Sequence, residues 1–286
     1  MSNPSPARSV LKVVRAPRRT MSSHFSAAHV GGPQLQDEMD PFIGIDHFDM
    51  RGPTFPPHPH AGFSAVTYLF EESEVGFVNR DSLGHQLRIE PGELLWTQAG
   101  RGVVHDEYPV RPGVPVYGLQ IFVNLASDKK FSEPTVLHAK APGIPLIEGP
   151  GLRARVLVGS SNGRTSELRP PTEVTLLDLT LQPGAHFEHV QPAGDSLLVY
   201  VTAGAVQVGP EGRRLETGDV AALAHDGERL LLSGADANTR VVVFAGRPLR
   251  EPVVSYGPFV MNNRAQLERA VQDYQSGRMG HLEPVN

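Results

Sequence analysis

Apolar residues between about positions 63 and 253 occur in short runs that glycine and proline separate. The runs are rich in β-branched and aromatic residues, as in "SAVTYLF", "VYGLQIFVNL" and "RVVVFAG". Runs of this length and composition are typical of β-strands, and many of the 29 glycines and 26 prolines mark turns between them. The pattern predicts an all-β fold.

A helical period appears once, near the C-terminus, in "NNRAQLERAVQDYQSG". Leu267, Val271 and Tyr274 recur at the spacing of one helix face, with Asn263 suited to cap the start and Gly277 suited to end the helix. We therefore predict one short α-helix over about residues 263–276, docked on a sheet.

A weak internal repeat divides the chain into two β units. "LRIEPGELLW" and "RLETGDVAAL" both contain a strand, a glutamate, a glycine turn, an acidic residue and a second strand, so that Glu90 matches Glu216. A segment rich in proline and glycine connects the two units. We predict an N-terminal domain over residues 1–135 and a C-terminal domain over residues 136–286 that includes the helix.

Composition excludes several classes of protein. The net charge is -5 and 40% of the residues are apolar, which is typical of a globular chain without the basic patch of a nucleic-acid-binding protein. The sequence has no run of roughly 20 apolar residues and no signal-peptide pattern, so we expect a cytoplasmic protein that binds neither membrane nor nucleic acid. Two fused units also favour a monomer. Without cysteine, any metal must bind to His, Asp or Glu.

Two pairs of candidate metal ligands follow the spacing of a strand face. His58 and His60 lie one residue apart in "PPHPHAGF", and His105 and Glu107 lie one residue apart in "VVHDEYP". On an extended chain residues i and i+2 point to the same face, so each pair points one way. If the two strands lie side by side, three imidazoles and one carboxylate converge inside the barrel. Such a set binds one divalent transition metal.

The ligand types favour a redox metal with open coordination positions. Imidazole and carboxylate ligands suit Fe(II) first, with Cu, Mn, Ni, Co or Zn as alternatives, and four protein ligands leave two positions free on an octahedral ion. Oxygen and a small aromatic substrate can use those positions. The repeat places non-ligand residues at the equivalent positions of the second unit: Val190, Pro192, Leu231 and Ser233. His186 and His189 lie nearby but alternate faces, so we expect a single metal, in the first unit.

Other candidates have competing interpretations. Glu107 is either a metal ligand or a nearby general base. His85 either contacts a metal ligand, without binding the metal itself, and so orients that ligand, or it lies on a surface turn. Asp46 and His47 are interpreted as structural residues, and Trp96 as a core residue rather than a substrate platform. The isolated histidines are interpreted as surface or hydrogen-bonded residues: His24, His29, His138, His225 and His281.

The motifs together resemble the pirin family of the cupin superfamily. The similar stretches are "DPFIGIDHFD", "PPHPHAGFSAVTYLFEE", "DSLGHQLRIEPGELLWTQAGRGVVHDEYP" and "EPVVSYGPFVMNN". The resemblance implies two tandem cupin (jelly-roll-like) β-barrels with iron in the first and no metal in the second. It assigns four metal ligands: His58, His60, His105 and Glu107. It also implies an apolar shell around them, to which Phe55, Phe63 and Trp96 contribute.

The resemblance implies two functions that the motifs do not separate. In the first, the protein is a quercetin 2,3-dioxygenase that cleaves a flavonol with O2, with the metal favouring ionisation of the substrate hydroxyl and Glu107 accepting the proton. In the second, it is a redox-responsive iron-binding regulator that binds a transcription factor or a metabolic enzyme without turnover. We favour the dioxygenase. A substrate-sized, partly apolar pocket above the metal would support it.

Overall fold

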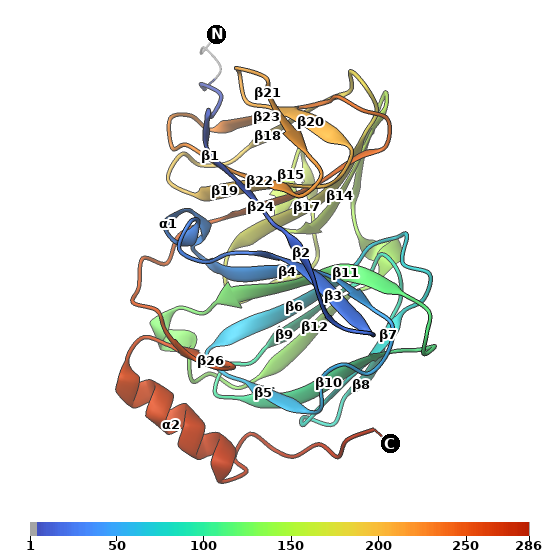
Figure 1. Cartoon of the computed structure of the whole chain (residues 1–286). Coiled ribbons are helices and arrows are strands. Elements are labelled where there is room, and N and C mark those ends of the chain that lie inside the picture. The colour runs from blue at the N-terminus through green and yellow to red at the C-terminus, as the bar shows by residue number, and fades with distance from the viewer. Residues whose placement is uncertain (1–4, 286) are drawn as a thin grey trace.

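Short strands in two sheets build a first barrel. The computed structural model describes residues 5–285 and contains the two stacked barrels shown in Figure 1. The first barrel has a seven-stranded sheet in the order β12 (Thr135–Ala139), β9 (Leu94–Gln98), β6 (Phe63–Leu69), β11 (Val116–Asn124), β4 (Phe42–Met50), β3 (Phe25–Val30) and β2 (Arg18–Ser22). Its four-stranded sheet has the order β5 (His58–His60), β10 (Val103–Pro109), β7 (Phe77–Asp81) and β8 (Gln86–Ile89).

The second barrel repeats this arrangement. Its seven-stranded sheet has the order β1 (Val10–Arg15), β22 (Asp219–Leu223), β19 (Ser196–Ala203), β24 (Thr239–Gly246), β17 (Val174–Leu181), β14 (Leu152–Val158) and β13 (Leu146–Gly149). Its four-stranded sheet has the order β18 (His186–Val190), β23 (Arg229–Gly234), β20 (Ala205–Val208) and β21 (Arg213–Glu216). The predicted all-β fold with two cupin barrels is therefore confirmed.

Short elements connect and cover the barrels. Two further hairpins consist of β15 (Ser160–Ser161) with β16 (Arg164–Thr165), and β25 (Val254–Tyr256) with β26 (Phe259–Met261). The helices are α1 (Gln36–Met39) and α2 (Arg264–Gln275), with two 3₁₀ turns, Ser127–Lys129 and Ala141–Gly143. None of the helices among residues 5–285 is long and apolar enough to cross a membrane.

The predicted C-terminal helix is present as α2. The Asn263 side chain accepts a hydrogen bond from the backbone N–H of Gln266 at 3.0 Å, which caps the start of the helix. Leu267 and Ala270 are its buried residues, and they pack with Met261 and Met279 against the first barrel. The apolar face that the sequence pattern indicates is therefore the docking face.

The two seven-stranded sheets face each other, and their outward residues form one shared core. Tyr68 and Trp96 of the first barrel belong to the same buried cluster as Leu198 and Phe244 of the second. Trp96 is completely buried in this cluster and does not line the cavity described below. It is a core residue, as its sequence context indicates, and it does not contribute the wall that the family resemblance implies for it.

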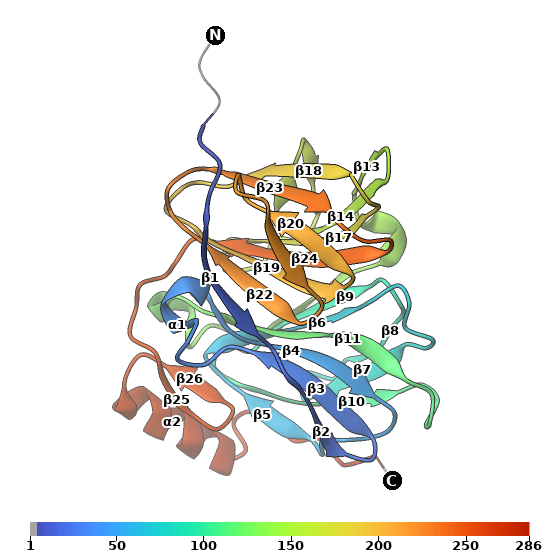
Figure 2. The same ribbon diagram turned by 45° about the horizontal axis from the view of Figure 1, so that its top comes forward.

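Three segments cross the division expected between residues 135 and 136. Strand β1 pairs with β22 and so joins the sheet of the second barrel, as Figure 2 shows, although it precedes the whole first barrel in sequence. Strand β12 pairs with β9 of the first barrel. The segment from β26 through α2 returns to the first barrel. Each exchange joins strands or apolar faces that are distant in sequence, and a composition pattern carries no signal of such pairing.

Strand β23 of the second barrel is shifted by one residue from the alignment that the repeat predicts. Both barrels share a turn in which an acidic side chain accepts a backbone N–H: Glu90 N–H to Glu93 Oε2 and Glu216 N–H to Asp219 Oδ2. Beyond this turn, however, Leu231 and Ser233 alternate with the buried residues of β23 and lie on its outer face. A one-residue insertion in the following loop is enough to reverse the faces.

The other strand of this sheet also departs from the predicted alignment, here by three residues. Val190 is 61% exposed, whereas Phe187 and His189 of β18 are buried inside the barrel and pair with Leu232 and Leu230. The interior positions opposite one another are thus Phe187 with Leu232 and His189 with Leu230. These residues, and not the four that the sequence repeat predicts, occupy interior positions of these two strands in the second barrel.

Candidate metal centre

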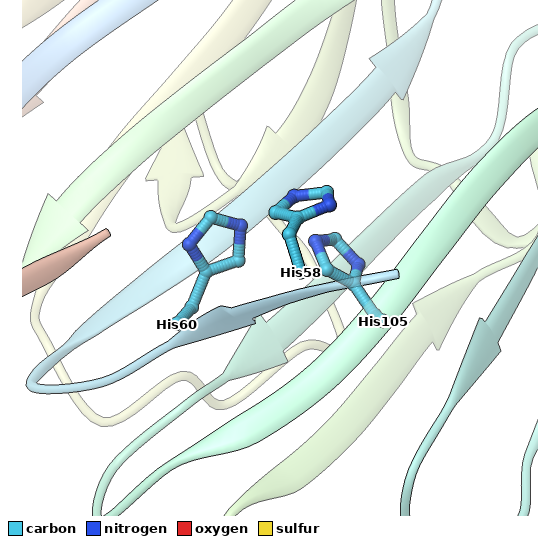
Figure 3. A group of neighbouring side chains, drawn as sticks. All are labelled: His58, His60 and His105. Atoms are coloured by element: carbon cyan, nitrogen blue, oxygen red, sulfur yellow. The ribbon is translucent and has the colours of Figure 1, made fainter. Parts of the chain in front are cut away.

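The two strands that carry the candidate ligands lie side by side. Strands β5 and β10 pair antiparallel, with His58 opposite His105 and His60 opposite Val103. Because side chains alternate along each strand, this register directs His58, His60 and His105 into the barrel. Figure 3 shows their imidazoles directed toward a common space. The side-by-side arrangement that the sequence predicts is present.

The three imidazoles form a compact group. Their ring centroids are 4.6 Å apart for His58 and His105, 4.8 Å for His58 and His60, and 4.8 Å for His60 and His105. One ring nitrogen from each residue lies within 4.8 Å of the other two. Among residues 5–285, this is the one group of three or more His, Asp or Glu side chains with the spacing of a metal site.

Hydrogen bonds behind the imidazoles leave nitrogen lone pairs free for a metal. His105 Nδ1 lies 3.1 Å from Asn79 Oδ1, and His58 Nδ1 lies 3.0 Å from the Pro56 carbonyl oxygen. Both partners are acceptors, so Nδ1 carries the proton and Nε2 keeps its lone pair. His105 Nε2 is buried and has no hydrogen-bond partner within the described residues. An orphaned acceptor of this kind is what a metal ion would satisfy.

Burial keeps the imidazoles in the neutral form that binds metals. Loss of hydration lowers the pKa of His60 to about 3 and lowers the pKa of His105 well below its usual value of 6.5. The pKa of His58 is also lowered, again mainly by burial. Three neutral imidazoles, two of them buried and that of His58 half-buried, fit a divalent transition metal and do not fit an anionic ligand.

Glu107 lies near this group but is not part of it. It is on β10, two residues beyond His105, and its Oε1 accepts a hydrogen bond of 3.0 Å from the Thr67 hydroxyl. Gln120 also contacts that hydroxyl, at 2.9 Å from its Oε1. Burial raises the pKa of Glu107 to about 7. The carboxyl is therefore poised to exchange a proton near neutral pH.

The imidazoles open into a cavity of about 720 Å³ with mostly apolar walls. Its lining includes the three histidines, Glu107 and Gln120, together with aromatic side chains: Phe25, Phe48, Phe55 and Phe122. The ring of Phe63 lies 5.0 Å from the ring of His60. Phe55 and Phe63 thus stand beside the imidazoles, as the family resemblance implies.

Two residues interpreted as a surface or hydrogen-bonded histidine and a structural aspartate also line the cavity. His29 and Asp46 both line it, and His29 Nδ1 lies 2.7 Å from Asp46 Oδ1. They belong to the neighbouring strands β3 and β4, whose pairing the sequence pattern does not reveal. His85, by contrast, is half-exposed and contacts Asp81 at 2.9 Å on a turn, outside the imidazole group. The surface-turn alternative fits His85.

Sequence reasoning did not identify Asn79, Thr67 or Gln120. Thr67 and Gln120 lie within the mostly apolar strands β6 and β11, Asn79 follows Phe77 and Val78 in β7, and Asn79 and Thr67 are themselves buried. A buried polar residue in such a strand needs a hydrogen-bond partner, which is the signal that could have indicated them.

The stacked barrels and the imidazole group define a two-barrel cupin protein with a candidate metal site in its first barrel. Residues 9–123 match the family model described as Pirin, and residues 176–280 match the Pirin C-terminal cupin domain. The chain belongs to the pirin family.

Relatives cover most of the chain. Human pirin is 35% identical over 255 residues, which cover 88% of this chain and 86% of that protein. A candidate quercetin 2,3-dioxygenase of Pseudomonas aeruginosa is 36% identical over 87% of this chain and 89% of that protein. The crystal structure of a quercetin 2,3-dioxygenase from Acinetobacter baumannii is similar with a TM-score of 0.87 and 28% identity, covering 96% of this chain and 99% of that one. The family thus includes pirins and quercetin 2,3-dioxygenases.

Proposed function

We propose that the protein is a mononuclear metal-dependent dioxygenase of the quercetin 2,3-dioxygenase type, acting with O2 on a flavonol-like aromatic substrate. The observation that carries this proposal is the placement of three neutral imidazoles at a cavity with aromatic walls. Its volume of about 720 Å³ lies within the range of small-molecule sites, roughly 300–1,000 Å³. The similarity to proteins named as quercetin 2,3-dioxygenases supports the same reaction.

His58, His60 and His105 would hold the metal, with Fe(II) as the first candidate. When bound there, the metal supplies a Lewis acid for the substrate oxygen and a redox centre for oxygen chemistry. The aromatic walls bind and orient the rings of the substrate. Because these walls also exclude water, the electrostatic effect of each polar group in the cavity is strengthened.

Glu107 accepts the substrate proton in this proposal. Its position outside the group of three imidazoles favours that role over metal ligation. Its pKa of about 7, raised by burial, matches what a general base needs near neutral pH. The Thr67 hydroxyl, 3.0 Å from Glu107 Oε1, helps to hold the carboxylate in place.

The regulatory alternative needs the metal but not the cavity. A redox-responsive iron protein that binds a transcription factor or a metabolic enzyme could have a closed barrel around its metal. The first barrel is instead open beside the imidazoles, with room for a ligand that contacts both Phe122 and Glu107. This openness is the reason for placing the dioxygenase first.

Turnover of quercetin by the reconstituted protein tests the proposal. The chain is loaded with Fe(II) without oxygen, mixed with quercetin and exposed to air, and loss of the flavonol absorbance is followed. The Glu107→Gln variant keeps the size and polarity of the side chain but removes its basicity, so we expect turnover to fall about 100-fold or more with metal content unchanged. The matched control is Glu188→Gln, an exposed glutamate on β18 of the second barrel.

The outcomes separate the two functions. Metal-dependent turnover that Glu107→Gln abolishes and Glu188→Gln leaves intact supports the dioxygenase. If Fe(II) binds at one ion per chain and quercetin does not decay, the dioxygenase proposal is contradicted. The next experiment is then to identify protein partners that distinguish the Fe(II) from the Fe(III) form.

A further inference from the structure

The C-terminal segment, defined here as residues 257–283, packs against both strands that carry the imidazoles. Figure 1 shows it passing beside β5 and β10 at the end of the first barrel. Its buried residues Phe259, Met261 and Met279 share one apolar cluster with Ala61, which follows His60, and with Val104, which precedes His105. The segment most distant from the imidazoles in sequence is thus in contact with the residues adjoining two of them.

Lys130 connects the C-terminal segment to the end of β5. Its side chain is completely buried, and its Nζ donates to Gly62 O at 2.9 Å, to Val260 O at 3.1 Å and to Asn124 Oδ1. The backbone adds two bonds: Val260 N–H donates to Ala61 O at 3.0 Å, and Ala61 N–H donates to Pro258 O at 3.3 Å. These bonds fix the backbone directly after His60.

The close approach of the chain at this point requires glycine. Gly62 has φ +82°, and a Cβ there would lie 1.9 Å from the Val260 carbonyl oxygen. The C-terminal segment therefore forms part of the immediate surroundings of His60.

Ser82 connects the C-terminal segment to β10. Its Oγ donates to the Met279 carbonyl at 2.6 Å and accepts the N–H of Val104 at 3.0 Å, while its own N–H donates to the Val104 carbonyl at 2.8 Å. Val104 directly precedes His105. Arg80 adds a further link, because it pairs with Asp106 and donates to the Glu283 carbonyl at 2.9 Å.

We propose that the C-terminal segment is a positioning element of the metal site, and that its attachment through Lys130 and Ser82 sets the affinity for the metal. Three imidazoles on two strands bind an ion tightly only if the strands are held at a fixed separation and angle. The links through Lys130 and Ser82 fix one strand each to the same segment. Opening of the segment would release β5 and β10 together and weaken binding of the metal.

The test compares these two links with matched links in the second barrel. Lys130→Met removes a buried cation held by carbonyl groups, and Arg8→Met is its control, because Arg8 is completely buried and donates to the carbonyls of Gly227 and Asp195. Ser82→Ala has its control in Ser166→Ala. Ser166 is a buried serine that donates to the Leu157 carbonyl and accepts the N–H of Leu168.

Affinity for Ni(II), a probe that does not change oxidation state under air, is measured by competition with a chromophoric chelator on folded protein. We expect Lys130→Met and Ser82→Ala to raise the Kd for Ni(II) about 10-fold or more, and the controls to leave it within about twofold. If the two variants bind as tightly as the unmodified chain, or the controls weaken binding equally, the C-terminal segment supplies general stability only and the proposal is wrong.

A second measurement needs no variant. Coupling is reciprocal, so a metal that needs the closed segment must also hold it closed. We expect Ni(II) to slow hydrogen exchange at the Val260 amide, which donates to Ala61, and to leave the Gln191 amide of the second barrel unchanged. Unchanged exchange at Val260 in the metal-loaded protein would contradict the proposal.

This inference rests on the metal-binding part of the proposed function, and the two can fail separately. If the unmodified chain binds no Ni(II), the metal site itself is contradicted. If it binds Ni(II) and either the Kd or the exchange fails to respond as described, the positioning role alone is excluded.

Discussion

The two barrels of this chain share one architecture and differ in what fills them. Each joins a seven-stranded sheet to a four-stranded sheet in the same order of pairing. The second barrel is packed with buried aliphatic side chains, including Leu179, Val199 and Leu232. The first is open to a cavity of about 720 Å³ beside three imidazoles. The filled interior stabilises the second barrel, whereas the open interior of the first barrel leaves room for a ligand.

The residues at matched interior positions of the four-stranded sheets account for the difference. If the buried pairs of β18 and β23 are matched to those of β5 and β10, Phe187 stands for His58, His189 for His60 and Leu232 for His105. Gly234 then stands for Glu107. Of these four positions in the second barrel, only that of His189 carries an imidazole, and its contacts differ from those of the first-barrel histidines.

His189 of the second barrel has no free nitrogen to offer. Its Nδ1 lies 3.0 Å from Ser161 Oγ and its Nε2 lies 3.1 Å from Gln191 Oε1. Both nitrogens are thus engaged by protein groups, whereas Nε2 of the buried His105 has no partner within the described residues. Both histidines are buried, so burial alone does not separate them. The unpaired ring nitrogen marks His105 as the candidate ligand.

Substituting one interior residue in each barrel tests this comparison most strongly. Leu232→His places an imidazole in an apolar core without a partner, so we expect the free energy of unfolding to fall by about 3 kcal/mol. His60→Leu in chelator-treated protein should change it by less than about 1 kcal/mol, because the imidazole it removes has no hydrogen bond at Nδ1. Urea unfolding of both variants measures the difference. Equal destabilisation by the two substitutions would show that a filled and an open interior do not differ in their contribution to stability.

The contact between the barrels has a smaller, pH-dependent effect. His47 of the first barrel lies 2.9 Å from the Tyr200 hydroxyl of the second, and burial lowers the pKa of His47 to about 3. The unfolded chain, with a usual pKa of 6.5, therefore binds a proton that the folded chain excludes as the pH falls below 6.5. Its contribution to stability is fully present above that value and decreases toward pH 3.

Between about pH 7 and about pH 5, this single residue should lower the free energy of unfolding by about 2 kcal/mol. The His47→Asn variant lacks the titrating group, so its stability should decrease by that much less over the same interval. Urea unfolding at the two pH values measures both slopes. A variant whose stability falls as steeply as that of the unmodified chain would show that His47 is protonated in the folded protein.

The sequence predicts the architecture and the imidazole group because both depend on local periodicity. Same-face spacing in "HPH" and "HDE" and the runs between glycines need no knowledge of distant contacts. Glu107 could be assigned to the site by the same spacing but not to a role, since that depends on Thr67 and Gln120 from two other strands.

What the sequence does not predict depends on register and on long-range packing. A single residue in one loop moves Leu231 and Ser233 to the outer face of the second barrel, and composition carries no record of it. The hydrogen bond from His105 Nδ1–H to Asn79 Oδ1 joins residues of two strands whose pairing the sequence pattern leaves open. Local sequence patterns likewise do not predict that the C-terminal segment attaches to both strands that carry the imidazoles.

Metal content per chain tests the central claim, that one ion binds in the first barrel and none in the second. The unmodified chain, the His105→Ala variant and the His186→Ala/His189→Ala double variant are loaded with Fe(II) without oxygen, desalted and analysed by elemental mass spectrometry. We predict about one ion per chain in the unmodified protein and in the double variant, and about none in His105→Ala. Retention of the ion by His105→Ala, or its loss from the double variant, would contradict the assignment of the metal to the first barrel.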